Sequence, residues 1–193
     1  MGALSHLRIV EIGSAAATSY CARLFADFGA SVLKIEPPRG DPLRGTAPLT
    51  PAGNSAWFAF LNFNKSSLAL DRNDSDAGTR LAALIADCDV LIDGRDVDAA
   101  DCPAIDIAGI KQRHPGLIHL EASWFGGEGP YAKFAATDST VRALTGLIKL
   151  VGPADGPPMH APDFQTGILA GLWGFISAAS SVLGRMQDGR GRS

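Results

Sequence analysis

Short apolar runs alternate with segments of helical spacing along most of this chain. The runs are rich in β-branched residues and flanked by glycine or polar residues, a pattern typical of strands buried in a sheet. They span Leu7–Ile12, Ser31–Glu36, Ser67–Leu70, Asp89–Ile92 and Leu117–Ala122. Between and after them, apolar residues recur every three or four positions, which predicts helices. These predicted helices span Ala15–Phe28, Trp57–Phe63, Ser75–Ala86, Ile105–His114, Ser139–Lys149 and Phe164–Met186.

Glycines and cap residues mark the boundaries of these elements. Gly13 follows the first strand run and Gly29 ends the first helical segment, as expected of a residue that adopts left-handed backbone angles at little cost. Asp74 or Ser75 is a suitable N-cap for the helix that follows. The strand, helix, strand order at the start favours a parallel sheet, because the crossover helix returns the chain to the same edge. We therefore predict one α/β domain over residues 1–193, with a mostly parallel sheet flanked by helices.

The last predicted helix is apolar on almost every side. Its longest apolar stretch, Ile168–Leu183, contains Ser177, Ser180 and Ser181 and is shorter than the ~20 residues that span a bilayer comfortably. A helix that is hydrophobic all round is normally buried. We therefore expect a core helix with no membrane contact. Residues 1–7 lack the basic and apolar regions of a signal peptide.

Charge and cysteine content narrow the range of possible partners and cellular compartments. The 17 Lys and Arg residues and 20 Asp and Glu residues give a net charge of −3, and the basic residues are scattered rather than clustered. A nucleic-acid surface needs clustered positive charge, so we expect no nucleic-acid partner. Cys21, Cys88 and Cys102 form no CxxC pair, which is typical of a reduced, cytoplasmic protein.

Several catalytic and cofactor motifs are incomplete in this sequence. The turn Gly13–Ala17 lacks the second and third glycines of a dinucleotide-binding loop, although Glu36 ends the second strand run as such a fold requires. No GxxxxGK[ST] loop and no GxSxG elbow are present, so His160 and Asp163 have no serine of that type to assist. Pro115–Gly116 separates His114 from His119 and breaks a shared helical face, so we expect no metal site.

Asp163 has two compatible roles. It follows a segment rich in Pro and Gly, Val151–Ala161, and directly precedes the long apolar helix. Such a position is typical of a helix N-cap, whose side chain accepts a bond from a free backbone N–H. The same N–H groups and the positive end of the helix dipole would also keep a carboxylate ionised, as a nucleophilic aspartate requires. Gly167 would then let a ligand or another backbone come close.

Six stretches in register resemble the class III CoA-transferase family, which includes formyl-CoA transferase, carnitine CoA-transferase and acyl-CoA racemases. They are Leu7–Glu11, Leu24–Pro37, Asn64–Asp71, Ala86–Ile92, Phe125–Tyr131 and Asp163–Gly167. The resemblance implies a Rossmann-like domain and catalysis through Asp163. In that scheme the carboxylate attacks an acyl-CoA to form a mixed anhydride, CoA returns to give an aspartyl-CoA thioester, and an incoming carboxylic acid then takes the CoA. Acyl-CoA and a carboxylic acid are therefore the implied substrates.

The resemblance also implies where CoA binds. By position, Ser14, Ala15 and Ala16 line the CoA site together with the segment from Leu70 to Arg72. Lys65 and Arg72 are candidates for contact with phosphate. The segment after Ile92 helps to hold CoA in the family, and here it places Gly94 and Arg95 at that position.

The sequence departs from the family at several positions. Thr137 stands where racemases carry a histidine, which favours CoA transfer over racemisation. Pro37 stands where transferases often carry a basic residue, and Asp93–Asp98 replaces the usual CoA-holding segment. Family members continue into a second domain and form interlocked dimers, so we expect a homodimer or a complementing chain. An acyl-CoA racemase and a non-catalytic or incomplete domain that needs a partner stay open as alternatives.

Overall fold

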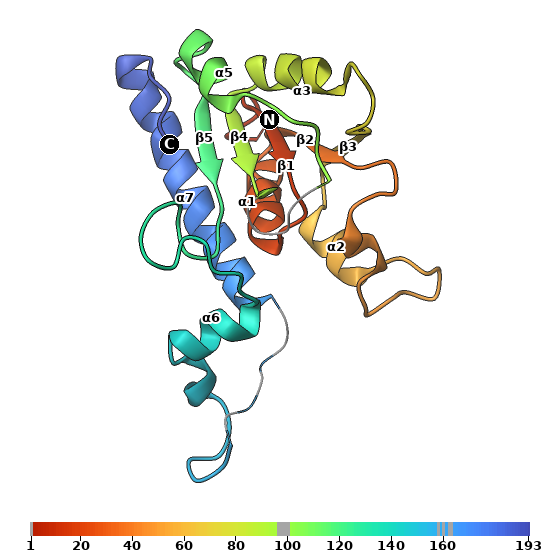
Figure 1. Ribbon diagram of the computed structural model, residues 1–193, viewed down its shortest axis with the longest axis vertical. Helices are drawn as coiled ribbons and strands as arrows, with labels where there is room; N and C mark the ends of the chain where they lie inside the picture. Colours follow the sequence, from red (N-terminus) through yellow and green to blue (C-terminus); the bar gives the residue numbers. More distant parts are fainter. Residues whose placement is uncertain (1, 96–100, 158, 160, 162–163) are drawn as a thin grey trace.

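The fold is a five-stranded sheet in which every pair of neighbouring strands is parallel. A computed structural model describes residues 2–95, 101–157, 159, 161 and 164–193. In the described residues the strand order is β3-β2-β1-β4-β5 (Figure 1). The strands are β1 (Arg8–Ile12), β2 (Ser31–Glu36), β3 (Ser66–Ala69), β4 (Val90–Asp93) and β5 (Ile118–Glu121). The predicted α/β class with a parallel sheet is confirmed.

Helices follow the predicted order with small shifts at their ends. They are α1 (Ala16–Asp27), α2 (Ala56–Leu61), α3 (Ala77–Ala86), α5 (Ile107–Arg113), α6 (Asp138–Leu144) and α7 (Gln165–Asp188), with 3₁₀ turns η1 (Pro42–Gly45) and η2 (Leu147–Leu150). The predicted helix over 139–149 divides into α6 and η2, because Gly146 between them has a positive φ of 77°. The predicted cap of α3 is wrong: Asp76 occupies the N-cap, without a side-chain bond, and Asp74 accepts its N–H instead.

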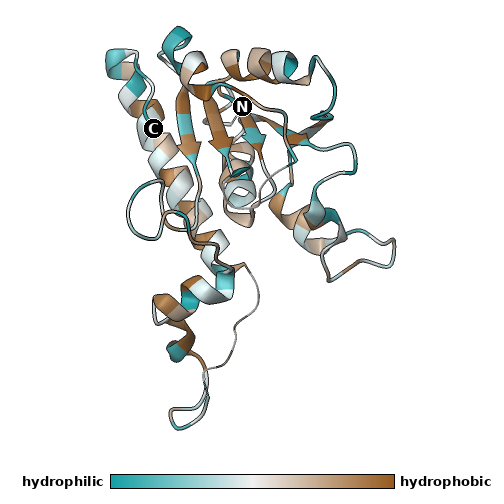
Figure 2. Ribbon diagram, viewed as in Figure 1, coloured by the Kyte–Doolittle hydropathy of each residue, from teal (hydrophilic) through white to brown (hydrophobic). Residues whose placement is uncertain are grey.

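Successive residues of each strand face opposite layers of helices. On one face of the sheet, Ile9 and Ile92 pack against α1 and α7. On the other face, Val10 and Leu91 pack against α3 and α5. This two-sided burial explains why the central strands β1 and β4 are mostly apolar, and the strands in Figure 2 are brown with teal bands at their polar residues. The strand residue that breaks this pattern most clearly is Glu11, which is fully buried.

Helix α7 packs along α1 on one side only (Figure 1). A side chain at Gly171 would lie 2.5 Å from the carbonyl oxygen of Ala17, so glycine is required for this close approach. On the outer side, Trp173 and Leu183 are each 66% exposed. The expectation that α7 is buried all round is therefore wrong, because no described element covers its outer face. By length and composition α7 could also cross a membrane, a test that core helices of soluble proteins pass as well.

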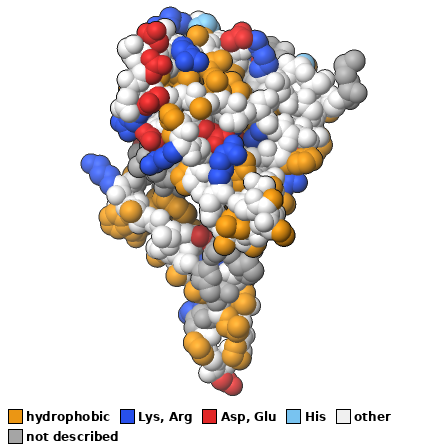
Figure 3. Space-filling view, turned by 90° about the vertical axis from the view of Figure 1, so that its right-hand side faces the viewer, with side chains coloured by type: hydrophobic (Ala, Val, Ile, Leu, Met, Phe, Trp, Pro, Cys, Tyr) orange, Lys and Arg blue, Asp and Glu red, His pale blue; other side chains and the backbone are white. Residues whose placement is uncertain are grey.

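The region of α6 and η2 extends beyond the end of the sheet (Figure 1). In the space-filling view this tapering end carries hydrophobic side chains on its surface (Figure 3). They include Leu144 and Leu150, which are 68% and 79% exposed. An apolar surface of this kind, like the outer face of α7, is typical of an interface.

Candidate active site at the carboxyl edge of the sheet

The turn between β1 and α1 lies at the centre of the carboxyl edge of the sheet. From β1 the chain continues to β2 and β3 on one side and later to β4 and β5 on the other, so this point is where the strand order reverses. Ligands of open α/β sheets bind at such a switch point. Gly13 has a φ of 94°, and a side chain there would lie 2.8 Å from the carbonyl carbon of Gly94. The turn is therefore fitted closely against the end of β4.

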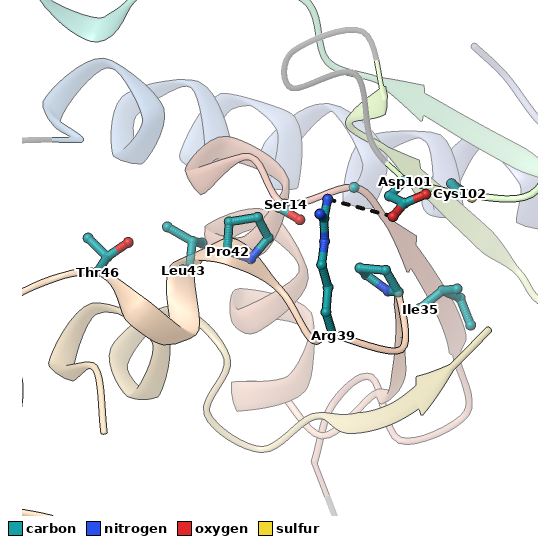
Figure 4. Close-up of a pocket in the computed structure, with 10 residues that line it drawn as sticks. Ser14, Ile35, Arg39, Pro42, Leu43, Thr46, Asp101 and Cys102 are labelled. Carbon is teal, nitrogen blue, oxygen red and sulfur yellow. Dashed lines mark ion pairs between the residues drawn. The ribbon is translucent and has the colours of Figure 1, made fainter. Parts of the chain in front are cut away.

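A cavity of about 220 Å³ opens on one side of this turn. We call it the small pocket; it is lined by Gly13, Ser14, Ile35, Pro37, Arg39, Pro42, Leu43, Thr46, Asp101 and Cys102. Arg39 extends across it toward Asp101, with 3.6 Å between the guanidinium and the carboxylate (Figure 4). The guanidinium of Arg72 lies 3.6 Å from the other oxygen of Asp101. Both arginine side chains are more than half exposed. Because they share the single carboxylate of Asp101, one positive charge is in excess.

A cleft of about 780 Å³ opens on the other side of the turn. We call it the large cleft; its walls are the first turns of α1 and α7, the end of β5 and the start of α6. Ser14 lines both cavities, and Ala15 and Ala16 line the cleft. Phe164 and Gly167 from α7 line it as well. The predicted closeness of Gly167 to another backbone is confirmed, since a side chain there would lie 3.4 Å from the nitrogen of Ala17.

The N-terminus of α7 is capped by a residue from another helix. Asp138 accepts hydrogen bonds from the backbone N–H of Thr166, at 2.8 Å, and from its hydroxyl. Phe164 occupies the N-cap position with a left-handed backbone, φ 64°, and makes no side-chain cap. Asp163, the predicted nucleophile, lies outside the described residues, as does His160. The Thr166 N–H therefore has an acceptor in Asp138.

Lys65 and Leu70 do not face either cavity. The Lys65 ammonium is 2% exposed and donates to Glu11 at 2.7 Å, to the Ser19 carbonyl and to Asn62. Leu70 is 2% exposed and belongs to the core between the sheet and α3. Neither side chain is therefore placed to contact a ligand in the small pocket, because both are enclosed by protein.

Gly94 and Arg95 lie beside the turn but not in the cavity lining. The N–H of Gly94 donates to the carbonyl of Ile12, which fixes the end of β4 to β1. The guanidinium of Arg95 folds back on Asp93 at 2.7 Å. Burial alone would raise the pKa of Asp93, but the nearby His119 imidazole and the hydrogen bonds from Arg95 outweigh it and lower that pKa well below the usual range. Arg95 therefore neutralises the end of β4.

Two buried carboxylates next to the site have charged partners that the sequence did not predict. Glu11 bonds Lys34 and Lys65; burial by itself would raise its pKa, but the two ammonium groups lower it to about 2. Glu36 bonds Arg44 and Ser67, which together overcome its burial and also lower its pKa to about 2. The available signal was a charged residue inside each apolar strand run. Among the described residues, no group of three His, Cys, Asp or Glu side chains could hold a metal ion.

The sequence relatives below are named CoA-transferases, and a solved structure of similar fold is a CAIB/BAIF family protein. The chain is 34% identical to a probable CoA-transferase of Mycobacterium tuberculosis, over 92% of this chain and 22% of that protein. It is 28% identical to the succinyl-CoA–D-citramalate CoA-transferase of Chloroflexus aurantiacus, over 98% of this chain and 47% of the relative. The crystal structure of a CAIB/BAIF family protein from Brucella suis covers 99% of this chain, with a TM-score of 0.90 and 28% identity, and the match covers 52% of that protein.

This chain spans about half the length of these relatives, or less. The family model described as CoA-transferase family III matches residues 4–193, almost every residue here. The match therefore includes the glycine turn at the switch point, the small pocket and the large cleft. The chain belongs to CoA-transferase family III.

Proposed function

We propose that this chain is the CoA-binding, nucleophile-bearing part of a CoA-transferase that moves CoA between an acyl-CoA and a carboxylic acid. It corresponds to the N-terminal portion of the large domain of the family. The observation that carries the proposal is that one turn, Gly13–Ala16, lines both cavities. A single ligand can therefore lie across it, with a nucleotide on one side and a thioester on the other.

The small pocket suits the nucleotide end of CoA. Arg39 in its lining, and Arg72, which shares Asp101 with Arg39, supply the positive charge that phosphates require. Helix α1 begins beside it at Ala16, and its N-cap residue, Ala15, has no side chain that could cap it. Backbone N–H groups and the helix dipole favour an anion at such a helix start. Arg39 also compensates for Pro37, which stands where relatives often carry a basic residue.

The large cleft suits the acyl thioester and its nucleophile. Asp163 is covalently attached to Phe164, which lines the cleft beside Thr166. Its carboxylate attacks the thioester carbonyl and expels CoA thiolate, which leaves a mixed anhydride on the aspartate. CoA thiolate then attacks the aspartyl carbonyl and releases the first carboxylate. The acceptor carboxylate attacks the aspartyl thioester, expels CoA thiolate and forms a second mixed anhydride. The thiolate then attacks the acceptor acyl carbon of this anhydride, which forms the new acyl-CoA and releases the Asp163 carboxylate.

The residue at position 137 favours transfer over racemisation. Racemisation requires a second acid or base across the substrate carbon. The position of the family histidine is Thr137, whose hydroxyl lies 3.0 Å from that of Thr140 and accepts the Thr140 N–H at the start of α6. A threonine hydroxyl does not exchange protons near neutral pH as an imidazole does. The acyl-CoA racemase alternative is therefore the weaker one.

The assembly and setting follow from the same chemistry. We infer that the chain acts as a homodimer or with a complementing chain, because the outer face of α7 and the tapering end expose large apolar side chains. The carboxylate mechanism needs no metal, and the free cysteines Cys21, Cys88 and Cys102 are consistent with a cytoplasmic setting. Light scattering tests the assembly: a monodisperse monomer that binds no hydrophobic dye would contradict it.

A trapping experiment tests the proposed chemistry. The protein is incubated with succinyl-CoA or acetyl-CoA, quenched with hydroxylamine and digested, and its peptides are analysed by mass spectrometry. We expect a hydroxamate on Asp163 that disappears in Asp163→Asn. Asp155→Asn is the matched control, because Asp155 is an exposed aspartate in the same connecting segment, and it should leave the adduct unchanged. A folded protein that gives no adduct with either ester would contradict an active transferase and favour the non-catalytic alternative.

A further inference from the structure

Four charged side chains are buried together beneath the small pocket. Glu11, Lys34, Asp41 and Lys65 each have side chains no more than 2% exposed. Two are positive and two negative, so the group is neutral overall. They come from β1, β2, the loop after β2 and the connection before β3. Isolated buried charges are costly, so each must be held by close partners.

Lys34 is the member of this group that contacts both walls of the small pocket. Its ammonium lies 2.8 Å from Glu11 and 2.8 Å from Asp41. It also donates a hydrogen bond to the carbonyl of Gly13 at 3.1 Å. Gly13 belongs to one wall of the pocket and Leu43 to the other. Asp41 accepts a hydrogen bond from the N–H of Leu43, so Lys34 is linked to both walls.

The register of the sheet makes this contact possible. Glu11 and Lys34 are directly paired on the parallel strands β1 and β2, and both side chains point to the α1 side of the sheet. Each strand ends within two residues of these positions, so the lysine side chain reaches past the carboxyl edge to the turn above it. No other described cation bonds the Gly13 carbonyl.

The bond to Gly13 also orients the turn. In a trans peptide the C=O and N–H groups point in opposite directions. With the Gly13 carbonyl held toward Lys34, the N–H of Ser14 points away from the buried charges. Ser14 lines both cavities, so the peptide that Lys34 holds is the one over which a bound ligand would pass.

We propose that Lys34 is a positioning residue for ligand binding: by bonding Gly13 and pairing with Asp41, it fixes the distance between the two walls of the small pocket. Lys34 touches no substrate in this role. The ligand named in the proposal, CoA through its nucleotide end, rests on the proposed function. The wall geometry is a property of the chain and can be measured without a ligand.

A charge-balanced variant separates positioning from folding. Lys34→Met alone would leave Asp41 buried without its cation, which is strongly destabilising. Lys34→Met combined with Asp41→Asn removes one charge of each sign and leaves Glu11 paired with Lys65. The matched control is Arg185→Met with Asp89→Asn. This ion pair, at 2.9 Å, also bonds a backbone carbonyl, that of Gly116, but lies at the amino edge of the sheet.

Two readouts are measured on the wild type, the Lys34 double variant and the control. Calorimetry gives the affinity for CoA and for adenosine 3′,5′-bisphosphate, a probe of the nucleotide end. Hydrogen exchange gives the protection of the backbone N–H groups over residues 13–16 and 41–46. We expect the Lys34 double variant to bind both ligands at least tenfold more weakly and to lose protection in these two segments. The control should lose thermal stability while keeping wild-type affinity and wild-type protection there.

The outcomes distinguish the inference from the proposed function. Unchanged affinity in the Lys34 double variant, or an equal loss of affinity in the control, would overturn the positioning role. If the wild type binds neither ligand, the proposed function fails, but hydrogen exchange still tests the inference. Protection in the Lys34 double variant that matches the wild type would overturn it, and a loss of protection confined to residues 13–16 and 41–46 would support it. Should the double variant not fold, Lys34→Arg replaces it. This variant keeps the charge but not the compact ammonium, and should bind at least threefold more weakly; unchanged binding would overturn the role.

Discussion

Asp138 at the start of α6 accepts a hydrogen bond from the backbone N–H of Thr166, 28 residues later, at a distance of 2.8 Å. Its other carboxylate oxygen accepts from Arg142 at 3.1 Å, and Arg142 in turn donates to the carbonyl of Ala161 at 3.2 Å. Asp138 and Arg142 thus hold the described residues on both sides of Asp163. The described segments that flank Asp163 in the sequence are therefore both tied to α6.

Asp138→Ala should destabilise the fold and weaken catalysis together. The Thr166 N–H loses its acceptor and the buried Arg142 loses its carboxylate, which we expect to cost about 1–3 kcal/mol. Urea unfolding measures this loss, and the hydroxamate yield at Asp163 should fall as well. Asp76→Ala is the control, because Asp76 occupies a helix N-cap without making a side-chain bond, and it should change stability by less than about 0.5 kcal/mol. Equal losses in both variants would contradict the linkage.

Stability should fall steeply in acid because of Glu11 and Glu36. Their pKa values are about 2 in the folded protein and 4.5 without the fold. A lowered pKa stabilises the folded state above the unfolded value, so the contribution is complete above pH 4.5 and is lost as the pH falls toward 2. The free energy of unfolding in urea, measured between pH 7 and pH 3, should therefore decline most below pH 4.5. Glu36→Gln should flatten this decline, and parallel curves would contradict the assignment.

Arg39 and Asp101 should affect nucleotide binding in opposite directions. Arg39→Ala removes a cation from the small pocket and should weaken CoA binding roughly tenfold, the value of one charge-assisted hydrogen bond. Asp101→Asn removes the carboxylate that competes for both Arg39 and Arg72 and should strengthen binding severalfold, with a steeper dependence on salt. Arg113→Ala, an exposed arginine in α5 before the amino edge of the sheet, should have no effect. Calorimetry in low and high salt measures the CoA affinity of all three variants. Weaker binding by Asp101→Asn would show that Asp101 does not compete with CoA for the two arginines.

The three thiols should react slowly and unequally with iodoacetamide. Burial raises the pKa of Cys88 to about 12 and that of Cys102 to about 11, and it raises the pKa of the buried Cys21 thiol further. Less thiolate means slower alkylation at pH 8. Cys102 should react first, and CoA should slow its reaction, because it alone of the three lines the small pocket. Peptide mass spectrometry over time measures the rates; protection of Cys88 but not Cys102 would place CoA elsewhere.

Strand and helix patterns were sufficient to predict the fold class. The apolar runs, Gly13 and Gly29 placed the first three elements correctly, because a parallel strand buried on both faces must be apolar almost throughout. Glycine at position 13 also marked the end of the first strand. The exposed face of α7 could not be predicted, since a helix that carries Trp173 and Leu183 on one face reads the same in the sequence whether or not another surface covers that face.

The sequence by itself determined the order of the elements, the parallel sheet and the family, because these depend on local periodicity and on motifs in register. Only the tertiary structure decided which charges meet. Glu11 and Lys34 are 23 positions apart and become partners through the pairing of β1 with β2. Asp138 reaches Thr166, and Lys65 turns inward to Glu11, for the same reason. Such contacts depend on strand register and helix packing, which bring distant residues within a few ångströms and which no local pattern specifies.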